Sequence, residues 1–340
     1  MLAGKIIAKA ISLNAVETIG TDRSRCLRMR FNRNTCTGCT SLCRTGAITI
    51  DEDVHIFADK CSECMLCVSA CPSDCFETRG PDFYSIIGRL RKIQSSVRTL
   101  VLGCTLRPDA ASHGKTFCFG LLSEEHILAL YVFLRSTLRI DVTGCVDCKN
   151  GFIAGVLEKR LECVETKTSL KISDRITLVR NKADLDFQEV SYDRRGFFKT
   201  LKQLTFAQAA GLFDTDEPGE ETRSYSSKRP PFKRELLNRA LKVLPEESFR
   251  AVLQHYYYDV DVAEECNNCF ACIGMCPTGA LKIESSEDRR DLFFSSSLCN
   301  GCGLCESFCM KKSLTVKKGF TGSDPRVFHN TKKEAACNER

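Results

Sequence analysis

The sequence lacks the motifs that mark an organic cofactor site or a nucleophilic active site. No strand-associated G-x-G-x-x-G, no P-loop, and no Ser/His/Asp or paired-carboxylate arrangement stands out in its 340 residues. It also has no apolar run near the about 20 residues of a membrane span. The first 20 residues hold no apolar core of a signal peptide. We therefore expect neither a membrane span nor export.

A large excess of charge of one sign is also missing. The 49 Lys and Arg residues are nearly balanced by 43 acidic residues, which leaves a net charge of +6. Such a balance does not predict a nucleic-acid partner. The basic residues between Lys311 and Lys333 are interpreted as a solvated face, the alternative being a docking site for an acidic partner.

Cysteine, in contrast, is abundant, with 23 residues. A chain of this length can bury a hydrophobic core and does not need disulfides for stability. Small secreted domains, which cannot build such a core, use disulfides instead. The number is odd, and most cysteines lie only two or three residues apart. This pattern indicates thiolates that bind metal in a reducing compartment, so we expect a cytoplasmic location.

The C-terminal part contains the same cysteine spacing twice. The runs Cys266–Cys276 and Cys299–Cys309 each place two residues, two residues and then three residues between successive cysteines. In this pattern three cysteines of one run wrap a [4Fe–4S] cubane, and the fourth binds the neighbouring cluster. Zinc sites use two separated pairs instead, so iron–sulfur is preferred over zinc.

A second pair of runs lies near the N-terminus, and one of its positions is changed. The run Cys61–Cys71 keeps the spacing, but the preceding run Cys36–Cys43 has Arg33 where the first cysteine is expected. Either this site holds a [3Fe–4S] cluster or none, or Cys26 supplies the missing thiolate. We favour Cys26, because an unexplained thiol is a liability in an anaerobic-type redox protein.

Both ends, residues 26–77 and 264–317, resemble bacterial-type dicluster ferredoxin domains. The resemblance and the spacing rule together predict four [4Fe–4S] clusters. Cys75 is interpreted as a buried small hydrophobe, with a spare ligand as the alternative. The predicted ligands form four sets: set 1 is Cys26, Cys36, Cys39 and Cys71; set 2 is Cys43, Cys61, Cys64 and Cys67; set 3 is Cys266, Cys269, Cys272 and Cys309; set 4 is Cys276, Cys299, Cys302 and Cys305.

The region between these domains alternates predicted strands and helices. Strands are expected over 98–102, 138–142 and 175–179, and helices over 123–134 (amphipathic, with Ser123 as N-cap) and 155–163. This order is typical of a small parallel α/β unit.

Cysteines of this region follow the strands, at the edge where open α/β sheets bind ligands. We call Cys104, Cys118, Cys145 and Cys148 the middle set. The arrangement loosely resembles thioredoxin-like [2Fe–2S] domains and the delta-type adaptor subunits of hydrogenase–heterodisulfide reductase systems. The four cysteines of the middle set indicate a fifth metal site, with an iron–sulfur centre preferred over zinc. The alternative is a redox-active Cys145/Cys148 dithiol.

The predicted fold class is α+β: two ferredoxin-like dicluster domains with a small parallel α/β domain between them and a flexible linker. The predicted divisions are an N-terminal segment (1–25), dicluster domain 1 (26–80), the α/β domain (81–190), a helical and linker region (191–262, flexible over 214–231), dicluster domain 2 (263–318) and a basic tail (319–340).

These features predict an electron-relay subunit of a larger anaerobic oxidoreductase complex, working with redox protein partners and without a catalytic residue of its own. The alternative is a reductase that uses Cys145/Cys148 on a disulfide or small substrate. A third class is a structural or regulatory iron–sulfur protein.

Overall fold

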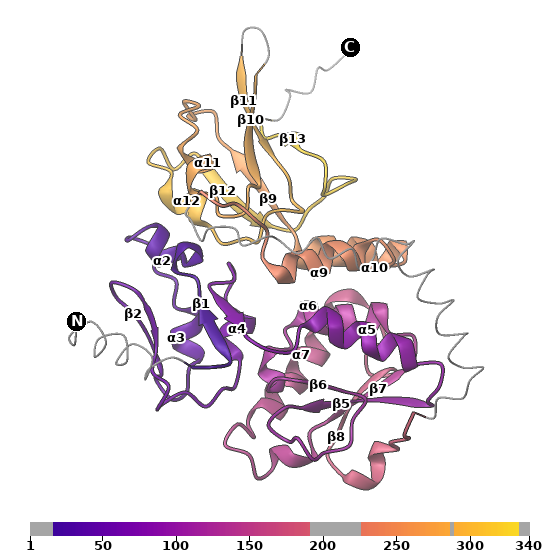
Figure 1. Ribbon diagram of the computed structural model, residues 1–340. Coiled ribbons are helices and arrows are strands. Elements are labelled where there is room, and N and C mark those ends of the chain that lie inside the picture. The colour runs from indigo at the N-terminus through magenta and orange to yellow at the C-terminus, as the bar shows by residue number, and fades with distance from the viewer. Residues whose placement is uncertain (1–15, 191–225, 286–288, 333–340) are drawn as a thin grey trace, which may run out of the picture.

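The structure is a computed structural model that describes residues 16–190, 226–285 and 289–332. Most of the predicted N-terminal segment, most of the predicted linker, the end of the predicted tail and Cys337 lie outside the described residues. Within the described ranges, no helix combines the length and apolar character needed to cross a bilayer. Figure 1 shows a first cysteine-rich unit beside an α/β unit, with a second cysteine-rich unit above both.

The first cysteine-rich unit consists of short elements joined by cysteine loops. Strand β1 pairs antiparallel with β4, and β2 pairs antiparallel with β3. The unit thus includes residues 19–25, which lie before the predicted start of domain 1. Its elements are β1 (Ile19–Thr21), the 3-10 turn η1 (Arg23–Arg25), α2 (Leu27–Arg30), α3 (Gly38–Leu42), β2 (Ile48–Ile50), β3 (Val54–Ile56), α4 (Leu66–Ala70) and β4 (Phe76–Thr78).

The second cysteine-rich unit repeats this plan. Strand β9, before the first cysteine run, pairs antiparallel with β12, after the last run, as β1 pairs with β4. Part of the predicted tail belongs to the unit, because β13 pairs with β11 and Phe320 is buried. Its elements are β9 (Tyr258–Val262), α11 (Ala271–Met275), β10 (Leu281–Ser285), β11 (Arg290–Phe294), α12 (Leu304–Phe308), β12 (Leu314–Lys318) and β13 (His329–Asn330).

The α/β unit contains a four-stranded parallel sheet in the order β6-β5-β7-β8, which confirms the predicted parallel sheet. Leu100, Leu138 and Ile176 lie in register across β5, β7 and β8, and all three are buried. The three predicted strands are present, and β6 is an addition. The elements are α5 (Phe83–Ile93), β5 (Thr99–Cys104), β6 (Gly114–Thr116), η2 (Phe119–Leu121), α6 (Glu124–Phe133), β7 (Thr137–Asp141), η3 (Thr143–Cys145), α7 (Ile153–Thr168), β8 (Ile176–Val179) and η4 (Lys182–Leu185).

Helix α6 differs from the amphipathic helix that was predicted. Five consecutive residues, 126–130, are buried, so the helix has no continuous polar face there. The reason is a helix from far along the chain: α9 (Phe232–Leu241) packs on α6, while α10 (Glu246–Tyr256) packs on α7 (Figure 1). Ser123 precedes α6 as predicted, but its hydroxyl bonds the ring of His126 and not a backbone N–H.

The described end of the predicted linker is held by both cysteine-rich units. The Arg229 backbone N–H donates to Pro277 O at 3.3 Å, and its guanidinium pairs with Glu77 at 3.1 Å. Arg25 donates to the carbonyl of Arg229 at 3.1 Å. Residues 226–231 were expected to be exposed linker because of their charge and proline content. These contacts contradict that expectation for the described part.

Candidate metal centres

Three of the four cysteine runs share an unusual backbone. In each, the second and fourth residues after the first cysteine have positive φ: Glu63 and Met65, Asn268 and Phe270, Gly301 and Gly303. A short helix then follows, α4, α11 or α12. Left-handed residues at these intervals turn backbone N–H groups toward one side, which forms a concave site for an anion.

Backbone N–H groups in these loops donate to cysteine sulfurs. Glu63 N–H lies 3.4 Å from Cys61 Sγ, and Gly301 N–H lies 3.4 Å from Cys299 Sγ. Hydrogen bonds of this kind stabilise the thiolate form, which is the form that binds iron. The loops therefore suit thiolate ligands in both chemistry and backbone geometry.

Sets 2 and 3 each surround one cavity. All four thiols of set 2 line a cavity of about 420 Å³ whose other walls include Ile48 and Ile56. All four thiols of set 3 line a cavity of about 250 Å³ together with Phe270 and Leu292. In set 3 the thiol of Cys309 comes from the later cysteine run, as the spacing predicts.

The thiols of set 4 also lie together. Burial, followed by the charges of Cys299 and Cys276, raises the pKa of Cys302 to about 12. Burial is also the main cause that raises the pKa of Cys305, and Cys302, Cys276 and Cys299 add to the effect. Cys276, from the earlier run, thus lies near the thiols of the later run.

Set 1 contains the departure from the repeated pattern. None of residues 33–39 has positive φ, and Arg33 is exposed. Cys26 is buried instead. It lies close enough to Cys39, as do Cys71 and Cys36, for their charges to add to the burial that raises the pKa of Cys39 to about 12. The structure therefore brings together the four thiols predicted for set 1.

The segment before Cys26 is fixed to the loop that follows Cys71. Arg25 Nε donates to Ser73 O, and Asp22 N–H donates to Cys75 O at 2.8 Å. Cys75 is buried and forms a side-chain hydrogen bond with Cys26, which is the largest cause lowering the pKa of Cys26 to about 6. The same bond raises the pKa of Cys75. Cys75 is therefore a fifth thiol that contacts set 1, through Cys26 and, by its backbone N–H, through Cys71 Sγ.

The middle set lies at the carboxyl edge of the parallel sheet. Cys104 ends β5, Cys118 follows β6, and Cys145 and Cys148 follow β7. Asn150 N–H donates to Cys148 Sγ at 3.4 Å, the same two-residue pattern as in the ferredoxin-type loops. Cys104, Cys145 and Cys148 line a cavity of about 490 Å³ together with Asp141 and Arg107.

Cys118 lies near both the other cysteines of the middle set and Cys64 of set 2. Burial, followed by Cys104, Cys64 and Cys145, raises the pKa of Cys118 to about 12. Gly120 permits this approach, since a Cβ at that position would lie 1.9 Å from the carbonyl oxygen of Cys64. The sequence contains this glycine, but nothing local indicates that the Cys64 backbone packs against it.

The thiols are spread around each site and do not converge on one point. Among the described residues, no three Cys, His, Asp or Glu side chains are placed to hold a single metal ion. A cubane distributes four thiolates over separate irons, whereas zinc needs all its ligands on one ion. Every cysteine in the described part of the chain is a free thiol, and of those outside the five sets, Cys163 is exposed.

Comparisons with known proteins agree with this chemistry. Residues 265–316 match the family model of a 4Fe-4S dicluster domain, and residues 54–77 match a 4Fe-4S binding domain. No curated protein and no solved structure matches the chain at a significant level. The two matches support a role in iron–sulfur electron transfer. The chain carries two 4Fe-4S ferredoxin-type domains, one on each side of a middle region.

Proposed function

We propose that this protein passes single electrons through four [4Fe–4S] clusters, held by sets 1 to 4, as the electron-relay subunit of a larger oxidoreductase complex in anaerobic cytoplasm. A [4Fe–4S] cluster supplies reversible one-electron chemistry when it is bound. The single observation that carries the proposal is a series of contacts that links each thiol set to the next. Its order is middle set, set 2, set 1, set 4, set 3.

Three contacts support the order inside and beside the ferredoxin-type domains. Helix α3, which holds Cys39 of set 1, packs against α4, which holds Cys67 of set 2. Helix α11, which holds Cys272 of set 3, likewise packs against α12, which holds Cys305 of set 4. Asn150, beside the middle set, donates to the carbonyl of Ser62 in the set 2 loop at 2.8 Å.

The link between the two domains is a hydrogen bond between their cysteine loops. Asn300 Nδ2 donates to the carbonyl of Pro72. Pro72 follows Cys71 of set 1, and Asn300 follows Cys299 of set 4. Close approach of these loops supports electron transfer between the domains, which a long separation would prevent.

Both ends of this series carry exposed apolar side chains. Met310, next to Cys309 of set 3, is 97% exposed, and Val146, next to Cys145 of the middle set, is 84% exposed. Each lies directly beside a thiol of a terminal set, where a redox partner has to dock for electrons to enter or leave the protein. We assign the donor and the acceptor proteins to these two opposite ends.

The middle set is proposed to hold a fifth metal centre, and an iron–sulfur centre is preferred over zinc. The reductase alternative has less support, because burial, followed by Cys148 and Cys104, raises the pKa of Cys145 to about 11. Dithiols that attack disulfides use a cysteine with a lowered pKa. Turnover of a disulfide with reduced viologen, lost in Cys148→Ser, would favour the reductase.

A redox titration of anaerobically purified protein tests the proposal. We expect about 16 iron atoms in sets 1 to 4, and uptake of at least four electrons per chain that are returned in full to an oxidised viologen. Clusters that do not cycle reversibly would overturn electron transfer in favour of a structural or regulatory role. Zinc in place of iron would overturn the proposal altogether.

A further inference from the structure

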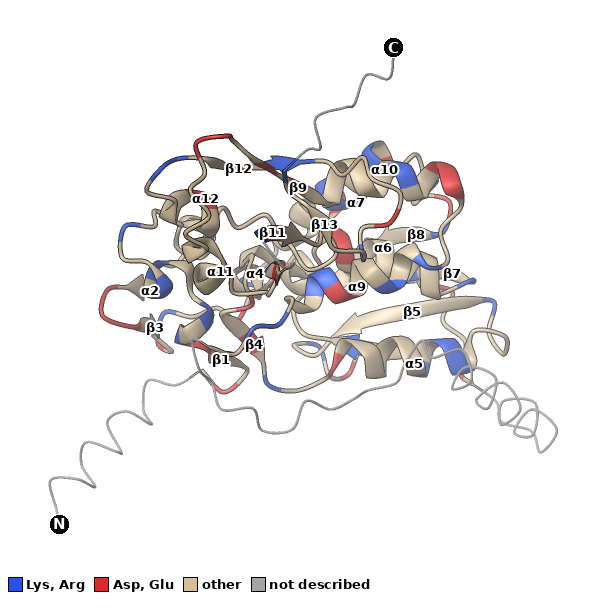
Figure 2. Ribbon diagram, turned by 90° about the horizontal axis from the view of Figure 1, so that it is seen from above, with Lys and Arg blue, Asp and Glu red and all other residues tan. Residues whose placement is uncertain are grey.

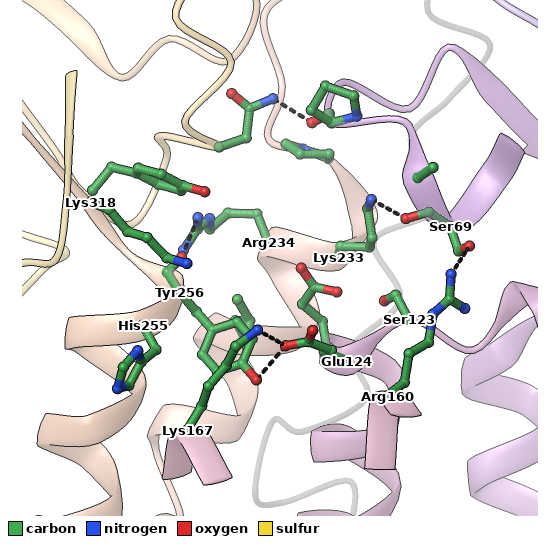
Figure 3. A pocket seen from close by; sticks show the side chains of 17 residues that line it. Ser69, Ser123, Glu124, Arg160, Lys167, Lys233, Arg234, His255, Tyr256 and Lys318 are labelled. Atoms are coloured by element: carbon green, nitrogen blue, oxygen red, sulfur yellow. Dashed lines mark hydrogen bonds and ion pairs between the residues drawn. The ribbon is translucent and has the colours of Figure 1, made fainter. Parts of the chain in front are cut away.

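A polar cavity of about 330 Å³ lies where the three units meet (Figure 3). Its lining side chains come from α4 in the first unit, from α6 and α7 in the α/β unit, and from α9, α10 and β12 in the C-terminal part. The cavity contains none of the cysteines of the five sets. Pro72 and Asn300, which join sets 1 and 4, are among its lining residues.

Positive side chains outnumber negative ones around this cavity. The cations are Arg160, Lys167, Lys233, Arg234 and Lys318, and the carboxylates are Glu124 and Glu125. Glu124 already accepts from Lys167 Nζ at 2.5 Å and from the Tyr256 hydroxyl at 2.8 Å. Lys233 is the main opposite charge that keeps the pKa of Glu125 low against the effect of burial. The two carboxylates are thus engaged by two of the lysines.

Arg160 forms no ion pair among the described residues, because the groups to which it donates are neutral. Burial lowers its pKa, and the charges of Glu125 and Glu124 oppose this effect. It donates to the carbonyls of Gly120 and Leu122 and to the hydroxyl of Ser69, at 2.8–3.0 Å. Arg160, Arg234 and Lys318 therefore face the cavity without a carboxylate partner among the described residues.

Arg234 is the most exceptional of the three. It is only 4% exposed, its Nη2 donates to the carbonyl of Tyr256 at 2.8 Å, and the guanidinium lies 4.4 Å from the ring centre of Tyr257. Within the described residues, its Nε and Nη1 have no hydrogen-bond acceptor. A buried charge with unsatisfied donors is costly, and an anion in the cavity would remove that cost.

Two helix N-termini add to the positive field. The first turns of α6 and α9 both contribute lining residues: Ser123, Glu124 and Glu125 from α6, and Pro231, Lys233 and Arg234 from α9. Helix N-termini favour anions through their free N–H groups and dipole. The volume is within the range of pockets that bind small molecules.

From the buried, unsatisfied guanidinium of Arg234 and the uncompensated charge around it, we infer that this cavity binds a small oxyanion with at least two negative charges, a phosphate or polycarboxylate compound. Arg234 offers two unpaired donors, Nε–H and Nη1–H. They point to different sides of the guanidinium, so each can donate to a separate oxygen of the anion. Arg160 and Lys318 supply further charge from opposite walls.

Binding would be linked to the redox state, and this part rests on the proposed function. An electron added near Pro72 or Asn300 repels the anion, so the oxidised protein binds it more tightly than the reduced protein. By thermodynamic reciprocity, the bound anion lowers the reduction potential of the nearest centres.

The test is anaerobic isothermal titration of the iron-loaded oxidised protein in Tris–chloride buffer, with inorganic phosphate, pyrophosphate and citrate as separate titrants. We expect one site per chain for at least one titrant. Arg234→Lys keeps the positive charge but removes the guanidinium N–H donors, and it is expected to weaken binding about tenfold. Lys318→Gln should weaken it about threefold, as for an exposed ion pair. The charge-matched control is Lys242→Gln, on an exposed residue outside the cavity.

Two results would overturn the inference: no titrant binds with 1:1 stoichiometry, or Lys242→Gln weakens binding as much as Lys318→Gln. The iron content and the reversible electron uptake of each variant are measured on the same samples. Failure of the anion site therefore remains distinguishable from failure of the proposed electron transfer.

Discussion

The side chain of Asn300 donates a hydrogen bond to the backbone carbonyl of Pro72, 228 residues earlier in the chain. Each residue directly follows a predicted iron ligand, Cys299 and Cys71. The bond therefore fixes the loop of set 4 against the loop of set 1. Nearby ring contact between Phe31 and Phe308, with centroids 5.3 Å apart, supports the same interface.

Replacing Asn300 by alanine is expected to loosen this interface. Loss of the hydrogen bond should cost about 1 kcal/mol of stability and slow electron exchange between the two ferredoxin-type domains, with iron content unchanged. Rapid-mixing kinetics with a viologen donor measure the exchange. Asn267→Ala is the matched control, since Asn267 holds the same position after Cys266 and is exposed. Equal rates in both variants would contradict the proposed path.

Cys26 and Cys75 are expected to respond differently to substitution. Cys26→Ser should remove one thiolate from set 1 and leave a [3Fe–4S] signal in the electron paramagnetic resonance of the oxidised protein, with a loss of about one iron. Cys75→Ala should keep the full iron content and lower the reduction potential of that centre, because a hydrogen bond to the Cys26 sulfur is removed. If instead Cys75→Ala loses iron and Cys26→Ser does not, Cys75 is the ligand.

Iron analysis also tests the middle set. A binuclear centre there should bring the total to about 18 iron atoms, and Cys104→Ser should return it to about 16. Cys163→Ser serves as the control, because this exposed thiol on α7 belongs to none of the five sets. A wild-type value of about 16, unchanged by Cys104→Ser, would remove the fifth iron–sulfur centre.

His126 should make stability depend on pH. Burial lowers its pKa from 6.5 to about 3, with Lys233 and Arg160 adding to the effect and Glu125 opposing it. As the pH falls below about 6.5, His126 is protonated in the unfolded chain but stays neutral in the folded protein. Its contribution to the free energy of unfolding is therefore fully present above pH 6.5 and is lost as the pH falls toward 3. At pH 5.5 the expected loss is about 1.4 kcal/mol.

Urea unfolding of the iron-loaded protein at pH 7.5 and pH 5.5 measures this dependence. His126→Gln should reduce the difference between the two pH values, whereas His55→Gln, on an exposed residue of β3, should not. Identical pH dependence in the wild type and in His126→Gln would show that the ring is not held neutral.

The sequence indicates the candidate sites more directly than the structure that surrounds them. The two-, two- and three-residue spacing is a local property, because each loop wraps its own site, and so sets 2, 3 and 4 follow from the cysteine positions. The strands that end near Cys104 and Cys145 were likewise evident from their apolar residues. The spacing rule does not predict Cys26 as a ligand of set 1. Its position depends on contacts that Asp22 and Arg25 make with residues 73–75, which are distant in the sequence.

What the sequence did not predict depends on distant packing. The even burial of α6 requires α9, about one hundred residues later, and the cavity around Arg234 requires all three units. Figure 2 shows the same interleaving from above, with α9 beside α6 and α10 beside α7. No local pattern in residues 123–134 indicates which helix covers them. Strand β6 was missed because it has only three residues, Gly114–Thr116, one of them glycine.

The covering of α6 by α9 also bears on how this chain can be divided. A fragment ending before residue 226 would expose the side of α6 that α9 covers, and a fragment starting there would expose the buried Leu236 and Leu237. Each half would then aggregate or recruit the other. We therefore expect the two halves to behave as one cooperative folding unit, and to complement each other when they are expressed as separate polypeptides.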